Sequence, residues 1–283
     1  DHNGSRGLGD VYKRQLTGVQ TRRLWHDGFL PSQAATPAAK QALERVSFDS
    51  NLIGALMSCS ITRDYFEPAT ACMIHNALQL PETAMVTDVG NACLGFMNGL
   101  TIAANLIETG VVKAALVASG ETIERPLSVC LKYLSSNPDL DREQLLKLLP
   151  TLTLGSGGVA YVLAHSSVAS EFAPKLVAAT GRSRTKLNTL CNGNGDYFIA
   201  QGEEFNPIMT TEAAELISSA ATLGGAVWPD LSELLGWSKD DVDHVFCHQV
   251  GKQVNGAFYR EMGLDFEKEF TIYQRMGNLA SAA

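Results

Sequence analysis

Short apolar runs alternate with amphipathic segments along most of this chain. Apolar and β-branched runs predict buried strands at 53–58, 84–89, 112–118, 157–164, 175–180 and 244–247. Helical spacing bounded by proline or glycine predicts helices at 67–80, 94–109, 139–149, 211–223 and 252–262. Such alternation of strands and helices is typical of an α/β protein with a buried parallel or mixed sheet.

The succession of elements restarts near residue 166, where one strand series ends and a second begins. We therefore predict two strand-rich halves, at 16–168 and 169–283. Residues 1–15 are polar, rich in glycine and without a hydrophobic period, and the run GLGDVYKRQ resembles translated adaptor sequence. We expect this segment to be a non-native leader outside the fold.

The composition argues against several classes of protein. Of the 283 residues, 45% are hydrophobic and 18% are charged, which is the opposite of the balance found in disordered chains. The net charge of -8, without a basic cluster, argues against nucleic-acid binding. The apolar stretch 94–107 is shorter than the ~18 residues of a membrane span and contains Asn98 and Asn105. We therefore expect no membrane span.

The cysteines are spaced as isolated thiols. They lie at positions 59, 72, 93, 130, 191 and 247, and no two form a C-x-x-C pair. This spacing argues against zinc ribbons and thioredoxin-type redox sites. A disulfide framework is typical of short secreted chains, so we expect thiols in a reducing compartment, the cytoplasm. We expect neither a metal site nor a cofactor-binding site.

Cys93 is the strongest candidate for a nucleophile. It follows a predicted strand and a Gly-Asn-Ala turn, and it precedes a long apolar helix that should be buried. Unpaired backbone N–H groups at a helix start, together with the positive end of the helix dipole, favour a thiolate. The alternative is a small buried thiol without chemistry.

Three further residues are candidates for the same chemistry. His248 ends a predicted strand, which is where α/β proteins often place functional groups, although a core histidine would have the same pattern. Asn278 lies in a Gly-Asn turn, which by itself indicates only a turn. Glu67 lies at a predicted helix start, where an acidic residue also stabilises the helix dipole.

Taken together, these segments resemble the thiolase superfamily, in the branch of β-ketoacyl-ACP synthase III. DVGNACLGFMNGL around Cys93 resembles the nucleophile segment, CHQVG around His248 the histidine segment, and MGNLASAA around Asn278 the asparagine segment. The order of the three residues fits the family, and Asn278 follows His248 by 30 residues, as the family would place it. TLTLGSGGVAYVL, from Thr151, resembles the glycine-rich stretch that closes the first half.

The resemblance implies a thiolase-like α/β fold with two similar βαβαβ-type halves in a layered αβαβα arrangement. The first half would carry Glu67 and Cys93, and the second half His248 and Asn278. It also implies a homodimer. The family fold has elements before residue 16 and after Asn278, so we expect a chain that is truncated at both ends.

The segment TRDYFEPATA around Glu67 is more specific. It resembles the head-to-head acyl-CoA condensing enzymes of bacterial long-chain olefin synthesis, whose glutamate lies 26 residues before the nucleophile, as Glu67 lies before Cys93. The resemblance implies that Cys93 takes an acyl group from one fatty acyl-CoA. Glu67, reaching across the dimer, would remove an α-proton from a second acyl-CoA, and His248 and Asn278 would hydrogen-bond its thioester oxygen. The product would be a 2-alkyl-3-oxoacyl compound, and the CoA thioester would be substrate rather than cofactor.

Two alternatives stay open. A β-ketoacyl-ACP synthase III would condense acyl-CoA with malonyl-ACP in fatty-acid synthesis and would bind acyl carrier protein. Gly251 and Gln253 argue against it, because that branch has an Asn and an Arg that contact the carrier at these positions. An inactive thiolase-fold partner or binding subunit is the second alternative. The presence of all four candidate residues argues against it.

Overall fold

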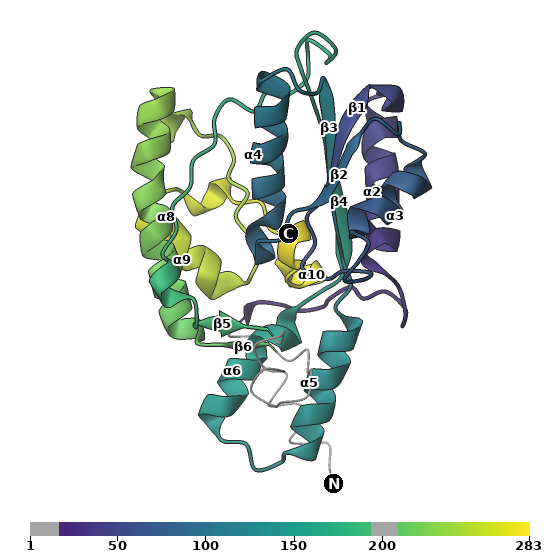
Figure 1. Cartoon of the computed structure of the whole chain (residues 1–283). Coiled ribbons are helices and arrows are strands. Elements are labelled where there is room, and N and C mark those ends of the chain that lie inside the picture. Colours follow the sequence, from purple (N-terminus) through teal and green to yellow (C-terminus); the bar gives the residue numbers. More distant parts are fainter. Residues whose placement is uncertain (1–16, 194–208) are drawn as a thin grey trace. The chain divides into compact units, whose positions relative to one another are not determined.

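A computed structural model describes residues 17–193 and 209–283, and the predicted leader at 1–15 lies outside the described residues (Figure 1). The chain divides into two compact units that alternate along the sequence. The sheet unit comprises Arg23–Thr122, Gly155–Val177 and Leu279–Ala283. The described residues of the helical unit are 17–22, 123–154, 178–193 and 209–278. The predicted division at 168/169 stays a prediction.

The sheet unit is built on a four-stranded mixed sheet. Its strands are β1 (Ile53–Ser58), β2 (Met85–Asp88), β3 (Ala114–Glu121) and β4 (Gly157–Ala164), in the order β2-β1-β3-β4. Strand β1 is parallel to both β2 and β3, whereas β4 is antiparallel to β3. The carboxyl ends of β1 and β2 therefore lie at the same edge of the sheet.

Helices cover both faces of this sheet, as Figure 1 shows. Helices α2 (Pro31–Arg45) and α3 (Thr70–Leu78) pack on one face, and α4 (Gly95–Glu108) packs on the other. Residues of β3 alternate between the two cores: Leu116 packs with α2 and α3, and Val117 packs with α4. Burial on both faces explains why β1 and β3 appear in the sequence as continuous apolar runs.

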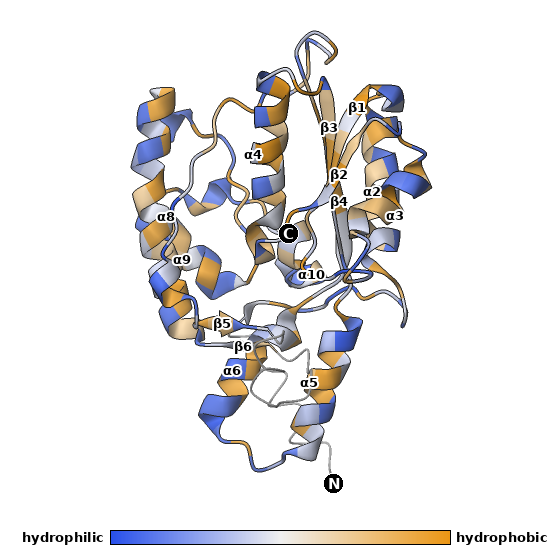
Figure 2. Ribbon diagram, viewed as in Figure 1, coloured by the Kyte–Doolittle hydropathy of each residue, from blue (hydrophilic) through white to orange (hydrophobic). Residues whose placement is uncertain are grey.

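The helical unit contains the remaining large elements. Its helices are α5 (Glu124–Ser136), α6 (Arg142–Thr153), α8 (Ala213–Leu235), α9 (Lys252–Met262) and α10 (Tyr273–Met276), and its small sheet pairs β5 (Cys191–Asn192) with β6 (Thr210–Thr211). Helices α5 and α6 have distinct apolar and polar faces in Figure 2, and Cys130 packs against Leu148 between them. An amphipathic helix needs such a partner to bury its apolar stripe.

Most predicted elements of the sheet unit are confirmed, while several in the helical unit are wrong. Helix α6 continues beyond Pro150 to Thr153, and α8 continues to Leu235. The predicted strand at 175–180 is irregular, and that at 244–247 keeps one isolated bridge, between Val245 and Glu269. Helices α2 and α5 were not predicted.

Candidate active site

Cys93 lies on a tight turn between β2 and α4. The Val89 N–H donates to Ser58 O at 2.8 Å, and the chain then enters a short 3-10 helix, Ala92–Leu94, directly before α4. Ala92 has a positive φ of 44°. This conformation is unfavourable for any residue that has a Cβ, and it is found most often at functional sites. Cys93 lies in this short helix, two residues before α4, so the predicted position at the start of a helix is close to the observed one. Its side chain is half-buried.

Small residues let α4 lie directly on the end of β1. A Cβ on Gly95 would lie 2.7 Å from Cys59 O, and a Cβ on Gly99 would lie 2.4 Å from Cys59 Sγ. The Phe96 N–H, in the first turn of α4, donates to Ser281 Oγ at 3.1 Å. The first turn after Cys93 is thus fixed by backbone packing and by a hydrogen bond. Met97 and Ile102 of α4 are exposed, so the expectation of a helix buried all round is wrong.

Glu67 lies in the loop 59–69, which follows β1 and precedes α3. Its side chain is exposed, and its neighbours Tyr65 and Phe66 are 54% and 91% exposed. Helix α3 begins at Thr70 rather than at 67, so Glu67 lies before the helix. The carboxylate at the start of α3 belongs to another residue, Asp88.

Asp88, at the end of β2, caps α3. Its Oδ2 accepts from the Thr70 N–H and its Oδ1 from the Ala71 N–H, both at 2.9 Å. A carboxylate at the first backbone N–H groups is the standard way to satisfy a helix N-terminus. Asp88 therefore stabilises the helix dipole of α3, a role that the sequence did not reveal. The explanation of Glu67 as the acidic residue at the helix start is wrong.

Glu67 and Cys93 belong to the same edge of the sheet. Loop 59–69 leaves the carboxyl end of β1, and the Cys93 turn leaves the carboxyl end of the neighbouring parallel strand β2. The two segments also meet, because a Cβ on Gly90 would lie 3.1 Å from Arg63 Nη2. Open α/β sheets bind ligands outside the carboxyl ends of their strands.

His248 and Asn278 belong to the helical unit, so the structure groups the four candidates in two pairs. The Nδ1 of His248 is buried and has no hydrogen-bond partner among the described residues, and burial lowers the pKa of this imidazole to about 4. The ring is therefore neutral near pH 7 and can donate a single N–H. Asn278 is buried, its N–H donates to Thr153 O at 3.0 Å, and the preceding Gly277 has a φ of 77°.

Gln249 connects the segments of this second pair and was missed in the sequence analysis. Its buried side chain donates to Cys247 O at 2.9 Å and to Phe270 O at 3.0 Å. Its Oε1 accepts from the Ile272 N–H at 3.0 Å, directly before α10. The His248 segment is thereby attached to the segment that leads into Asn278. The signal in the sequence was the glutamine within CHQVG.

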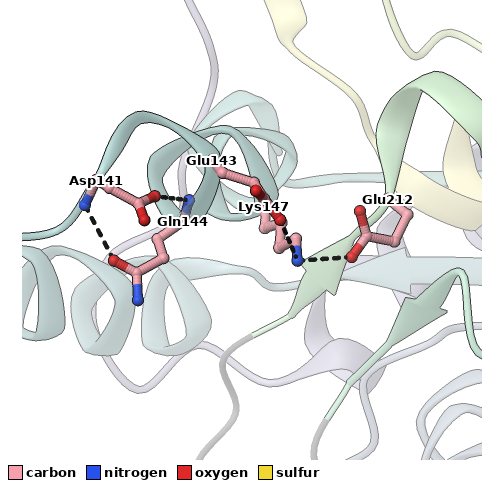
Figure 3. Close-up of polar contacts among 5 residues, drawn as sticks. All are labelled: Asp141, Glu143, Gln144, Lys147 and Glu212. Atoms are coloured by element: carbon pink, nitrogen blue, oxygen red, sulfur yellow. Dashed lines mark hydrogen bonds and ion pairs between the residues drawn. The ribbon is translucent and has the colours of Figure 1, made fainter.

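The helical unit also contains a cavity of about 430 Å³ between α6 and the first turns of α8 and α9. Its lining is mainly apolar and includes Leu146, Leu149 and Ile217. Lys147 also lines this cavity. Its Nζ lies 3.1 Å from Glu143 Oε1 and 2.8 Å from Glu212 Oε1. Figure 3 shows these two ion pairs. A cavity of this size and composition is typical of a small-molecule site.

Two features are absent from the described ranges, 17–193 and 209–283. No group of three or more His, Cys, Asp or Glu side chains in them is arranged to hold a metal ion. No helix in them is long and apolar enough to cross a membrane.

Comparison with known families assigns the class of this protein. The model of 3-oxoacyl-[acyl-carrier-protein] synthase III matches residues 87–132, and the model of the C-terminal part of that family matches 233–283. An acyl-CoA:acyl-CoA alkyltransferase of Xanthomonas campestris is 35% identical over 276 residues, which cover 98% of this chain and 76% of the relative. The chain therefore belongs to the 3-oxoacyl-ACP synthase III family.

Within that family the chain is similar to the alkyltransferases in particular. The acyl-CoA:acyl-CoA alkyltransferase of Shewanella oneidensis is 32% identical, with 95% of this chain and 76% of the relative covered. A β-ketoacyl-ACP synthase III of Thiobacillus denitrificans is 25% identical, with 94% and 76% covered. A cysteine-to-serine variant of Xanthomonas campestris OleA, solved with lauric acid and lauroyl-CoA, superposes with a TM-score of 0.86 at 34% identity, covering 95% and 76%.

These findings confirm the resemblance, the thiolase-like α/β fold and the acyltransferase class. The roles of Cys93, Glu67, His248 and Asn278 stay predictions.

Proposed function

We propose that this protein is an acyltransferase that joins two fatty acyl-CoA molecules by Claisen condensation through a thioester on Cys93. The observation that carries this proposal is the pairing of two segments at one edge of the sheet. One is the Cys93 turn after β2, and the other is the Glu67 loop after β1. A nucleophile and a carboxylate base are the two groups that a condensation without decarboxylation requires.

The first step is acylation of the cysteine. The Cys93 thiolate attacks the carbonyl carbon of an acyl-CoA, a new C–S bond forms, and CoA leaves as its thiol after taking up a proton. Backbone N–H groups near the start of α4 would stabilise the oxyanion of the tetrahedral intermediate. The close packing of α4 on β1 supports this step, because it holds the turn in one position.

The second step needs a base. Glu67 removes a proton from the α-carbon of the second acyl-CoA, and the resulting enolate attacks the carbonyl carbon of the Cys93 thioester. The new C–C bond gives a 2-alkyl-3-oxoacyl-CoA, and Cys93 leaves as a thiolate. His248 and Asn278 would donate hydrogen bonds to the enolate oxygen, and the lowered pKa of His248 keeps its ring neutral for that purpose.

The known relatives support these roles. The solved Xanthomonas campestris OleA variants replace a glutamate, a cysteine and a histidine, and one holds lauroyl-CoA. The glutamate precedes the cysteine by 26 residues in that chain, the same interval as between Glu67 and Cys93. The histidine follows the cysteine by 142 residues there and by 155 residues here, so this chain has extra residues between the two.

We further propose a homodimer in which Glu67 acts in the partner's active site, in the cytoplasm. The exposure of Phe66 supports this arrangement, since a large apolar side chain beside a functional acid is commonly covered by a partner.

The second candidate is condensation of acyl-CoA with malonyl-ACP, the reaction that the name of the Thiobacillus denitrificans relative indicates for that protein. Gly251 and Gln253 disfavour binding of an acyl carrier protein here. An inactive partner subunit is the candidate from another class.

The decisive experiment compares single substitutions in the purified protein, supplied first with acyl-CoA alone and then with added malonyl-ACP. Cys93→Ala should abolish both acylation and condensation. Glu67→Ala should form the acyl-enzyme, detected by mass spectrometry, but no condensed product, whereas Glu82→Ala, an exposed glutamate in the same unit, should behave as wild type. Condensation by the wild type only with malonyl-ACP would overturn the proposal in favour of the second candidate. A Cys93 that no acyl-CoA acylates would favour the inactive subunit.

Mixed dimers test the position of Glu67. Dimers that contain one Cys93→Ala and one Glu67→Ala chain should regain one working site if Glu67 acts across the dimer. Failure to regain activity in dimers shown to mix would assign Glu67 to its own subunit.

A further inference from the structure

The last residue of β3, Glu121, is a fully buried carboxylate that the proposed mechanism does not use. Its Oε1 accepts from the Ile61 N–H at 2.9 Å and from the Ser281 N–H at 3.3 Å. Its Oε2 accepts from Thr62, from the N–H at 3.4 Å and from the hydroxyl at 3.2 Å. One carboxyl group thus joins β3 to two segments that are distant in the sequence.

The partners of Glu121 are matched to a carboxylate. All four contacts are donated to the two oxygens, and a backbone N–H has no capacity to accept a proton in return. Burial nevertheless raises the pKa of Glu121 to about 7, because the hydrogen bonds offset only part of the cost of removing the charge from water. Burying an acid costs free energy, and the four hydrogen bonds offset part of that cost.

The first connection of Glu121 leads to the Glu67 loop. Ile61 and Thr62 are at the base of loop 59–69, six and five residues before Glu67. The Thr62 hydroxyl also accepts from the Thr122 N–H at 3.3 Å, which adds a second link between this base and the end of β3. The tip of the loop is exposed, so the direction in which Glu67 projects depends on how firmly the base is held.

The second connection leads to the Cys93 turn. Ser281 donates its N–H to Glu121 and accepts the Phe96 N–H on its own hydroxyl oxygen at 3.1 Å. Phe96 lies three residues after Cys93, in the first turn of α4. A displacement of Ser281 would therefore shift the first turn of α4, directly after the nucleophile.

We propose that Glu121 is a positioning residue for both half-reactions, holding the Cys93 turn through Ser281 and the Glu67 loop through Thr62. This inference rests on the proposed function. It assigns to one buried side chain the task of positioning both the Cys93 turn and the loop that carries Glu67, without contact between Glu121 and the substrate.

The two connections can be cut separately. Ser281→Ala removes the acceptor of the Phe96 N–H and leaves the loop contacts, whereas Thr62→Val removes the hydroxyl contacts and leaves the Ser281 contacts. Single-turnover acylation of Cys93 by acyl-CoA is followed by mass spectrometry, and condensation is started from the pre-acylated enzyme. Glu108→Gln, an exposed glutamate at the end of α4, is the control for Glu121→Gln.

We expect Ser281→Ala to slow acylation and Thr62→Val to slow condensation while acylation stays within about twofold of wild type. Each slowed step should lose on the order of tenfold or more, since a misplacement of about 1 Å is worth roughly a hundredfold. In Glu121→Gln the amide oxygen can still accept from Ile61 and Ser281, but its NH₂ faces the Thr62 N–H. This variant should therefore resemble Thr62→Val.

Three results would overturn the inference. One is a folded Glu121→Gln protein whose two half-reactions both match Glu108→Gln. Another is a loss in every variant that affects both steps equally, which a purely structural role would produce. The third is a Ser281→Ala protein that acylates at the wild-type rate. A wild type that acylates but does not condense two acyl-CoA molecules refutes the proposed function instead, and the acylation rate of Ser281→Ala then still tests the connection from Ser281 to the Cys93 turn.

Discussion

The buried carboxyl of Glu121 should make the stability of the sheet unit depend on pH. Burial raises the pKa of Glu121 from its ordinary value of 4.5 to about 7 in the folded protein. Between these two pH values the folded state holds a proton that the unfolded state has released. By linkage, the free energy of unfolding must then fall as the pH rises.

The size of the effect follows from the same two values. Below pH 4.5 the group is protonated in both states, and its contribution is fully present. As the pH rises through 4.5 to about 7 that contribution is lost, and the interval corresponds to roughly 3 kcal/mol at the usual conversion of about 1.4 kcal/mol per pH unit. Above pH 7 both states are ionised, and the effect should level off.

The assay is urea unfolding at a series of pH values from 4.5 to 8, for wild type and Glu121→Gln. Other titrating groups contribute equally to both proteins, so the difference between their free energies of unfolding isolates Glu121. Near pH 4.5 the neutral acid and the amide should differ little. Towards pH 8 the glutamine variant should gain roughly 3 kcal/mol relative to wild type. Glu108→Gln, which changes an exposed glutamate, should show no such trend.

Two outcomes would refute this reasoning. A difference that stays constant from pH 4.5 to 8 would mean that Glu121 titrates at the same pH in the folded and unfolded states. A difference that grows in favour of wild type as the pH rises would mean that the four hydrogen bonds outweigh the cost of burial. The folded-state pKa of Glu121 would then lie below 4.5 rather than near 7.

Three further predictions concern single residues. His248→Gln should show the opposite pH trend to Glu121→Gln, because burial lowers the pKa of His248 from 6.5 to about 4. In urea unfolding, the wild type should lose stability relative to this variant as the pH falls from 6.5 towards 4. Gly99→Ala should lower the free energy of unfolding by about 1–3 kcal/mol, since the new Cβ would lie 2.4 Å from Cys59 Sγ, whereas Gly181→Ala, with open space around it, should change it by less than about 0.5 kcal/mol. Asp88→Ala should cost about 1–2 kcal/mol in thermal or urea unfolding through loss of the cap on α3, and a neutral result would contradict the capping assignment.

Elements whose cause is local could be predicted from the sequence. Strand β1 (Ile53–Ser58) and helix α9 (Lys252–Met262) have the predicted bounds, because the apolar period and the flanking residues specify them. Helix α2 (Pro31–Arg45) was missed although the signal was present: Pro31 stands at its first position, and the Gln33 side chain accepts from the Leu30 N–H.

Elements whose limits depend on distant contacts could not be predicted. Proline normally ends a helix, yet α6 continues from Pro150 to Thr153. The Asn278 N–H donates to Thr153 O, and Leu154 bridges to Asn278, so the end of α6 is fixed by a partner more than a hundred residues later. No pattern near Pro150 contains that information.

The residues of the candidate site also differ in whether their position depends on local sequence or on distant contacts. Cys93 could be predicted because a strand, a turn and an apolar helix are adjacent in the sequence. Asp88, Glu121 and Gln249 were missed because each is defined by donors elsewhere: Asp88 by the start of α3, Glu121 by Thr62 and Ser281, and Gln249 by the backbone before α10. A buried polar residue is identified by its partners, which a single sequence does not provide.

The arrangement of loop 59–69 explains how an exposed glutamate could act with precision. Flexible exposed acids are poor bases for carbon acids, because the reacting atoms must be held in a near-attack geometry. Here the base of the loop is fixed to Glu121, and its middle is held where Asp64 Oδ1 accepts from the Ser32 N–H at 2.9 Å. Beyond these contacts, Tyr65, Phe66, Glu67 and Pro68 are exposed. A short exposed tip on a rigid base can be ordered completely by a partner subunit or a bound substrate, and such ordering would make proton abstraction depend on the assembled site.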